Sequence, residues 1–213
     1  MSVSIDDYCD AHTSQPEGVL NDIYRSIALH TANPHMSSSP YQGVLLEMLV
    51  RLKQPRIAVE LGSYAGYGSV CMARGLAPDG MLHVVEANEE CEYLIRQHLD
   101  MAGMSARVSI HIGQALEVIP QLPDGIEVAF VDADKVNYQQ YYDMLLPKMA
   151  SGGLLILDNM LWYGRVLESP ETQLRCDRST RVIQQLNDYI TNDTRVSNIL
   201  LPLRDGVMVC MVR

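Results

Sequence analysis

Short apolar runs alternate with helical stretches through the middle of the chain, and this alternation limits the possible folds more than any other feature. Each run has the length of a strand and is apolar almost throughout. The runs are residues 56–62, 81–87, 108–113, 126–132 and 152–159. Helical stretches separate them at residues 67–76, 89–102, 114–121 and 137–150. Strands in this order predict a mostly parallel sheet that helices cover on both faces.

The two ends of the chain follow other patterns. Two amphipathic helices are predicted at the N-terminal end, over residues 17–32 and 39–52. Near the C-terminus a helix over residues 179–193 precedes two apolar runs. Only Arg204 and Asp205 separate those runs, which predicts a tight antiparallel hairpin.

Together these patterns predict an α/β fold of one domain over residues 1–213. We expect a Rossmann-like, doubly wound, mostly parallel seven-stranded sheet with an antiparallel C-terminal hairpin and an N-terminal helical cap. The apolar content of 47% is sufficient for a single core.

The charge balance argues against two classes of partner. The chain has 16 basic and 26 acidic residues, a formal charge of -10, which disfavours nucleic acid and anionic membranes. The N-terminal sequence "MSVSIDDYCDAH" lacks the basic start and apolar stretch of a targeting signal, and no run approaches the about 18 apolar residues of a membrane helix. We therefore expect a cytoplasmic protein.

A glycine-rich loop follows the first predicted strand in "VELGSYAGYGS". Gly62 and two further glycines permit a tight bend, although their spacing is not G-x-G-x-x-G. The second strand ends at Glu86, where a carboxylate can accept hydrogen bonds from ribose hydroxyls. The two features favour an adenosine-bearing ligand. The alternatives are a turn that needs small residues for packing and an ordinary glutamate at a strand end.

Acidic and amide side chains end the fourth and fifth strands. Asp132 ends the fourth, and Asp158 with Asn159 ends the fifth. Paired parallel strands lie about 4.8 Å apart, so these side chains converge if the two strands are neighbours. Carboxylate and amide oxygens are the ligands that Mg²⁺, Ca²⁺ and Mn²⁺ prefer. Lys135 could instead neutralise the carboxylates as a simple ion pair.

Aromatic residues near these carboxylates have two possible roles. Trp162, the only tryptophan, could form a wall of a substrate pocket or close the core, and we favour the pocket. The tyrosines at 138, 141 and 142 have helical spacing, which favours the core.

The motifs "VELGSYAGYG", "HVVEANEE", "FVDADKVNYQQYY", "GGLLILDNMLWYGRV" and "LPLRDGVMVCMVR" occur in this order. In these motifs the chain resembles the cation-dependent O-methyltransferases that use S-adenosylmethionine, a family that includes the caffeoyl-CoA and catechol O-methyltransferases. The resemblance covers about residues 16–213. It implies an enzyme with S-adenosylmethionine and a divalent cation as cofactors, Mg²⁺ or alternatively Mn²⁺ or Ca²⁺.

The resemblance also implies roles for individual residues. Asp132, Asp158 and Asn159 correspond to the metal ligands, and Lys135, beside Asp132, corresponds to the general base. The residues implied to contact the cofactor are Met36, Glu60, Gly62, Glu86, Ala115 and Asp132. Many relatives have serine where Gly68 stands, so Ser69 is expected to replace that hydroxyl.

The function implied is methyl transfer to a hydroxyl of a vicinal aromatic diol of the catechol, caffeoyl or flavonoid type. Residues 163–181 are expected to meet this acceptor, and a homodimer is expected by analogy. A nicotinamide-dependent oxidoreductase would need G-x-G-x-x-G and has no use for Asp158 and Asn159. A non-catalytic nucleotide-binding module is the other alternative, and Lys135 argues against it.

Overall fold

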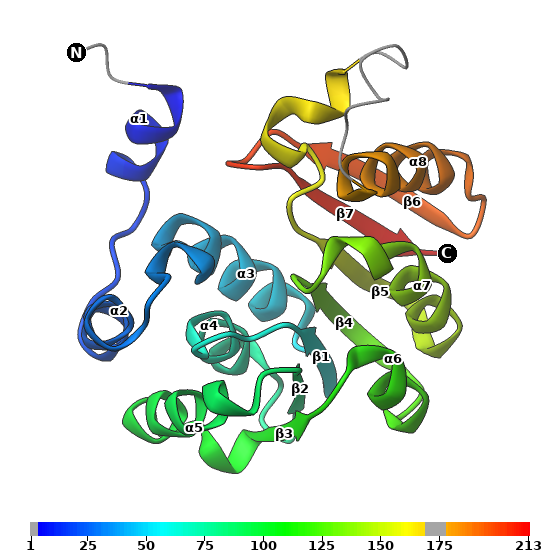
Figure 1. Cartoon of the computed structure of the whole chain (residues 1–213). Helices are drawn as coiled ribbons and strands as arrows, with labels where there is room; N and C mark the ends of the chain where they lie inside the picture. Colours follow the sequence, from blue (N-terminus) through cyan, green and yellow to red (C-terminus); the bar gives the residue numbers. More distant parts are fainter. Residues whose placement is uncertain (1–3, 169–177) are drawn as a thin grey trace. The chain divides into compact units, whose positions relative to one another are not determined.

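A computed structural model of the chain describes residues 4–168 and 178–213 (Figure 1). The chain divides into two compact units, Met1–Gln114 and Ala115–Arg213. The units are described in turn, and one domain over residues 1–213 stays a prediction.

The first unit contains three parallel strands. They are β1 (Ile57–Leu61), β2 (Met81–Glu86) and β3 (Val108–Ile112), with β2 paired to both of the others. Leu61 lies opposite Val85, and Glu86 lies opposite Ile112, so the carboxyl ends of the strands lie at the same edge. The connections are α4 (Tyr67–Gly75) and α5 (Glu92–Met101).

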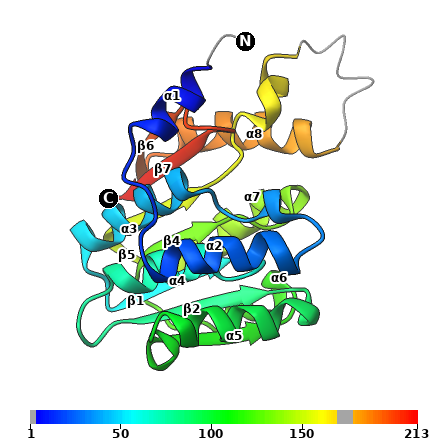
Figure 2. The same cartoon turned by 90° about the vertical axis from the view of Figure 1, so that its left-hand side faces the viewer.

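Three helices precede β1, and the second and third of them pack on α4. These are α1 (Ile5–Ala11), α2 (Val19–His30) and α3 (Pro40–Lys53), with the short turn η1 (Pro34–Met36) before α3. Leu20, Ile23 and Ile27 of α2 share a buried cluster with residues of α4 and α5, and Figure 2 shows α2 beside both helices. The seven-residue helix α1 was not predicted, because it is too short and polar to show an apolar period.

The second unit contains a mixed set of strands. It consists of β4 (Ile126–Val131), β5 (Met149–Leu157), β6 (Val196–Leu201) and β7 (Val207–Val212), with helices α6 (Ala115–Val118), α7 (Tyr138–Leu145) and α8 (Arg178–Asn192). Strand β5 pairs in parallel with β4 and antiparallel with β7, which pairs with β6.

Several boundaries in this unit differ from the prediction. The helix expected over residues 137–150 ends at Leu145, because a turn with Pro147 follows and β5 already begins at Met149. The hairpin loop comprises residues 202–206 rather than Arg204 and Asp205 alone. Pro202 has no N–H to continue the ladder, and Arg204 has a φ of 49°.

The sheet topology confirms the predicted fold class. The seven strands are ordered β3-β2-β1 in the first unit and β4-β5-β7-β6 in the second, with the antiparallel pairing confined to the C-terminal strands. The tyrosines at 138, 141 and 142 are buried, as predicted. Among the described residues, none of the helices is both long and apolar enough to span a membrane.

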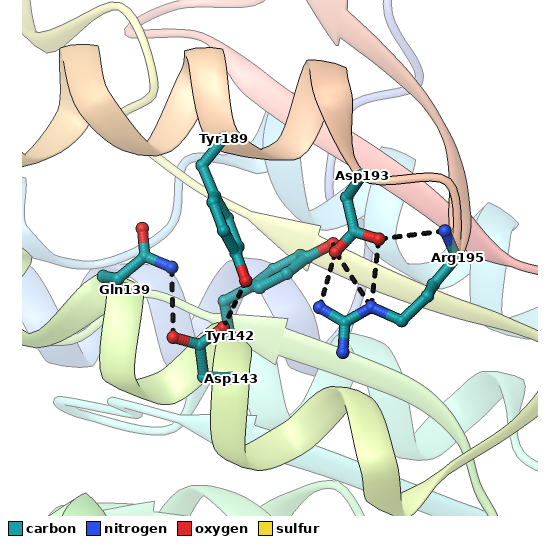
Figure 3. Close-up of polar contacts among 6 residues, drawn as sticks. All are labelled: Gln139, Tyr142, Asp143, Tyr189, Asp193 and Arg195. Carbon is teal, nitrogen blue, oxygen red and sulfur yellow. Dashed lines mark hydrogen bonds and ion pairs between the residues drawn. The ribbon is translucent and has the colours of Figure 1, made fainter.

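Polar contacts join α7 to α8 and to the turn that follows α8 (Figure 3). The Tyr142 hydroxyl donates to Asp193 Oδ2 at 3.0 Å, and Arg195 Nη2 lies 2.6 Å from the same oxygen. The Asp193 side chain is only 7% exposed. Hydrogen bonds from the Arg195 side chain are the main reason that the pKa of Asp193 is lowered to about 2.

A second carboxylate, further along the two helices, also joins α7 to α8 (Figure 3). Asp143 on α7 accepts from the Tyr189 hydroxyl of α8 at 3.1 Å and from Gln139 Nε2 at 3.1 Å. Helix α7 follows the segment that contains Asp132 and Lys135, so these contacts hold the helix next to part of the candidate site.

We expect Asp193→Asn to lower the free energy of unfolding by about 2 kcal/mol at pH 7. A lowered folded-state pKa stabilises above the unfolded value, so the difference from wild type should shrink below about pH 4 and be small near pH 2. Urea unfolding across this pH range measures it. Asp188→Asn, an exposed position on α8, is the control. An equal loss at all pH values would contradict the assignment.

Candidate active site

Glu86, at the end of β2, binds the backbone of the loop that follows β1. Its Oε2 accepts from the N–H of Ser63 at 3.1 Å and of Tyr64 at 2.8 Å, and its Oε1 accepts from the N–H of Asn88 at 2.9 Å. Tyr64 has a φ of 54°, which is unfavourable for a residue with a side chain. The buried Glu86 carboxylate therefore holds the glycine-rich loop in shape, and one lone pair of Oε1 is left to accept from a ligand.

Glu60, near the end of β1, faces the first turn of α4. The Ser69 hydroxyl donates to Glu60 Oε2 and lies 2.6 Å from the Ser63 hydroxyl. A Cβ at Gly68 would lie 2.6 Å from Glu60 Oε1 and 3.3 Å from Ser38 Oγ. Gly68 therefore leaves room for the buried Glu60 carboxylate, which a serine in this position would displace.

Gly62 and Met36 are the other residues of the first unit that the sequence predicts as cofactor contacts. Gly62 has a φ of 84°, and its N–H donates to Val85 O at 2.9 Å. This conformation favours glycine and turns the chain at the end of β1. Met36 ends the turn η1, and its side chain is 56% exposed.

In the second unit, the pairing of β4 with β5 brings the two predicted aspartates together. Val131 lies opposite Leu157, and the Asp158 N–H donates to Val131 O at 3.0 Å, so Asp158 follows directly beside the end of β4. Burial raises the pKa of the Tyr138 hydroxyl well above its usual value, and the nearby carboxylates of Asp132 and Asp158 raise it further. Both carboxylates therefore lie close to one tyrosine.

Asn159 directs its side chain by a bond to the hairpin loop. Its Nδ2 donates to Asp205 Oδ2 at 3.1 Å, and its φ is 59°. A carboxylate can only accept, so the amide oxygen of Asn159 does not face Asp205.

Lys135 is paired with Asp132. Its Nζ lies 2.8 Å from Asp132 Oδ1, donates to Ala133 O at 3.0 Å and lies 4.9 Å from the centre of the Tyr138 ring. The Lys135 side chain is 11% exposed. The ammonium group thus compensates charge at the end of β4, which is the ion-pair role considered for it as an alternative.

Asp134 has a different environment from Asp132. It accepts from Asn137 Nδ2 at 2.6 Å and from the Tyr141 hydroxyl. These bonds join the turn after β4 to α7, so Asp134 holds the entry to that helix.

Trp162 and Ala115 are the remaining predicted residues of this unit. Trp162 Nε1 is buried and has no acceptor among the described residues. An indole N–H without a partner is costly, which is consistent with a bond to a ligand. Ala115 is the buried first residue of α6. Residues 169–177 of the predicted acceptor segment lie outside the described residues.

A hard divalent cation fits the donor set at the ends of β4 and β5. The register of β4 and β5 places Asp132 and Asp158 next to one another, and the Asn159 amide turns its nitrogen toward Asp205 and so keeps its oxygen for another partner. These are the ligand types that such a cation prefers. Within residues 4–168 and 178–213, no group of three or more His, Cys, Asp or Glu side chains is placed so that it could hold a metal ion.

Sequence reasoning missed Asp205 and the backbone contacts of Glu86. The sequence predicts only a hairpin turn at Asp205, which lies far in sequence from Asn159. No local signal marks such a contact. The N–H groups of Ser63 and Tyr64 carry no side-chain signature either, so Glu86 was predicted only as a ligand contact.

Known proteins resemble this chain over nearly its whole length. The O-methyltransferase family matches residues 10–213. Catechol O-methyltransferase of Niastella koreensis is 32% identical over 215 residues, which cover 99% of this chain and 97% of the relative. Tricin synthase 1 of Oryza sativa is 32% identical over 186 residues, which cover 82% of this chain and 74% of the relative.

Solved structures give the same result. The O-methyltransferase from Bacillus cereus in complex with SAH superposes with a TM-score of 0.86 at 27% identity, covering 98% of this chain and 97% of that one. TomG of Streptomyces achromogenes, in complex with SAM, has a TM-score of 0.84 at 26% identity, covering 98% and 95%. These matches confirm the resemblance that the motifs predicted.

We expect Glu86→Gln to lower the free energy of unfolding by about 1–3 kcal/mol even without ligand. Glutamine has one acceptor oxygen, so its NH₂ group must face at least one of the three backbone N–H groups that the carboxylate binds. Chemical unfolding of the ligand-free protein measures the loss. Glu90→Gln, at an exposed position in the turn that follows β2, is the control. If both variants unfold alike, Glu86 does not stabilise the loop.

Proposed function

Because the chain belongs to the O-methyltransferase family, we propose that it transfers the methyl group of S-adenosylmethionine to one hydroxyl of a vicinal aromatic diol, with a divalent cation as cofactor. The observation that carries the cation dependence is the pairing of β4 with β5, which places Asp132 and Asp158 next to one another after the strand ends, with Asn159 as the following residue. The acceptor is of the catechol, caffeoyl or flavonoid type.

Asp132, Asp158 and Asn159 are the proposed ligands of the cation, Mg²⁺ or alternatively Mn²⁺ or Ca²⁺. When bound, such a cation acts as a Lewis acid that favours the phenolate form of a diol whose free hydroxyl has a pKa of about 10. Methyl transfer forms an oxygen–carbon bond as the carbon–sulfur bond breaks, which gives the methyl ether and S-adenosylhomocysteine. The proton of the hydroxyl must leave.

Lys135 is the proposed acceptor of that proton, at Nζ. It can act in this way only from its neutral form, and its Nζ lies 2.8 Å from Asp132 Oδ1. Binding of Asp132 to the proposed cation would leave less of its negative charge for Lys135 and so would weaken the ion pair. The low exposure of Lys135 keeps water from replacing it as a base.

Other residues are proposed to bind the cofactor or the acceptor. The proposed cofactor contacts are Met36, Glu60, Gly62, Ser69, Glu86, Ala115 and Asp132. Glu86 can offer Oε1 to the ribose while Oε2 holds the loop. Trp162 is the proposed acceptor contact, because its buried N–H lacks an acceptor among the residues described. A homodimer, a cytoplasmic location and the lack of nucleic-acid or membrane partners stay predictions.

Purified protein with S-adenosylmethionine and Mg²⁺ should methylate a vicinal diol such as caffeate but not its monohydroxy analogue coumarate. EDTA should abolish turnover, and excess Mg²⁺ should restore it. Asp158→Ala should lower kcat by more than about 100-fold and keep cofactor affinity in calorimetry. Methylation of the diol that EDTA leaves unchanged would refute the cation dependence.

Lys135→Met should lower kcat by about 10²–10⁴ while the Kd of the cation stays near the wild-type value, since methionine keeps the volume but has no basic atom. Rates from single turnovers separate chemistry from product release. Lys135→Arg preserves the ion pair with Asp132 but is a poor base, so it should be equally slow. If Lys135→Arg is active, Lys135 acts through its charge and not as a base.

A further inference from the structure

The hairpin loop at residues 202–206 holds the turn that follows β5 through several bonds. Met160 N–H donates to Gly206 O at 2.9 Å, and Leu161 N–H donates to Asp205 O at 2.8 Å. The two Asp205 carboxylate oxygens bind Asn159 Nδ2 and the Tyr163 N–H. One residue of the loop thus contacts three residues of the turn.

We propose that Asp205 is a positioning residue that fixes which atom of the Asn159 amide is presented to the cation. The inference rests on the proposed function. An amide can turn over to exchange its oxygen and nitrogen, and only the oxygen can bind a cation. The Asp205 carboxylate has no proton to donate, so it selects the orientation in which the nitrogen faces it.

The backbone of the turn also depends on Asp205. Asn159, Trp162 and Tyr163 have φ values of 59°, 46° and 56°. Residues with side chains adopt this region at a cost and keep it only where the surroundings impose it. The bonds from Tyr163 N–H and Leu161 N–H to Asp205 impose it here.

Gly206 allows the loop to come close enough for these bonds. A Cβ on Gly206 would lie 2.5 Å from Leu161 Cγ and 2.7 Å from Leu161 N, and Gly206 has a φ of +87°. Only glycine fits this contact without displacing Leu161. The Asp205–Gly206 pair therefore brings a carboxylate to the side of Asn159 that lies away from its amide oxygen.

The test exchanges the two polar side chains. Asn159 Nδ2 and Tyr163 N–H bind different oxygens of Asp205, so in Asp205→Asn the new NH₂ group must face one of these two donors. Titration of Mn²⁺, followed by electron paramagnetic resonance, should show affinity weakened by about 10–100-fold. Asp188→Asn, which removes one exposed negative charge, should bind Mn²⁺ like the wild type.

The double variant Asn159→Asp with Asp205→Asn keeps the net charge and reverses the donor and acceptor. Asparagine at 205 can donate to one oxygen of an aspartate at 159 and accept from Tyr163 N–H, and either oxygen of that aspartate can bind a cation. Mn²⁺ affinity should return to within about threefold of the wild type. The single variant Asn159→Asp completes the double-mutant cycle.

The outcomes distinguish a failure of the proposed cation-dependent function from a failure of the positioning role of Asp205. If the wild type binds no Mn²⁺, the proposed function fails and this inference falls with it. If the wild type binds Mn²⁺ and Asp205→Asn binds equally well, the inference alone is overturned. If the double variant is folded, by circular dichroism, and binds as weakly as Asp205→Asn, Asp205 serves only the fold of the hairpin. Should Asp205→Asn not fold, the affinity of the folded double variant decides.

Discussion

The hydrogen bond from Asp158 N–H to Val131 O, 3.0 Å long, extends the pairing of β4 and β5 beyond the last residue of each strand. An aspartate follows the last residue of each strand. Because the strands are parallel, their ends lie at the same edge of the sheet, and the two like charges are brought together. The chain compensates part of this charge with Lys135. Proximity of the carboxylates is a direct result of register, so a slip of one residue would send one carboxylate to the other face.

In both the turn after β5 and the loop after β1, a carboxylate stabilises an unfavourable backbone conformation. Each contains a non-glycine residue in the left-handed region, Tyr163 with a φ of 56° and Tyr64 with a φ of 54°. In each case the N–H of that residue donates to a carboxylate, of Asp205 or of Glu86. A charged acceptor makes stronger bonds to backbone N–H groups than a neutral one, which helps to offset the unfavourable backbone.

The sequence allowed prediction of those parts of the fold that depend on apolar periodicity. Strand β4, expected at residues 126–132 and found at Ile126–Val131, is apolar and buried at nearly every position. The start of β5 at Met149 was missed, because Met149 and Ala150 were assigned to the end of the preceding helix. The proximity of Asp132 and Asp158 followed from strand ends alone. Asp205 could not be predicted, since its contact with Asn159 depends on how a loop folds back.

Contacts that depend on how loops fold also explain why residues predicted as ligand contacts have structural partners. Glu86 was expected to bind a ribose, yet its carboxylate accepts three backbone N–H groups of the protein. Its charge is therefore needed before any ligand arrives, because those N–H groups would otherwise be buried without acceptors. Loss of ligand binding on substitution of such a residue does not by itself show that the residue touches the ligand. Stability measured without ligand distinguishes the two effects, since only the structural contacts contribute to it.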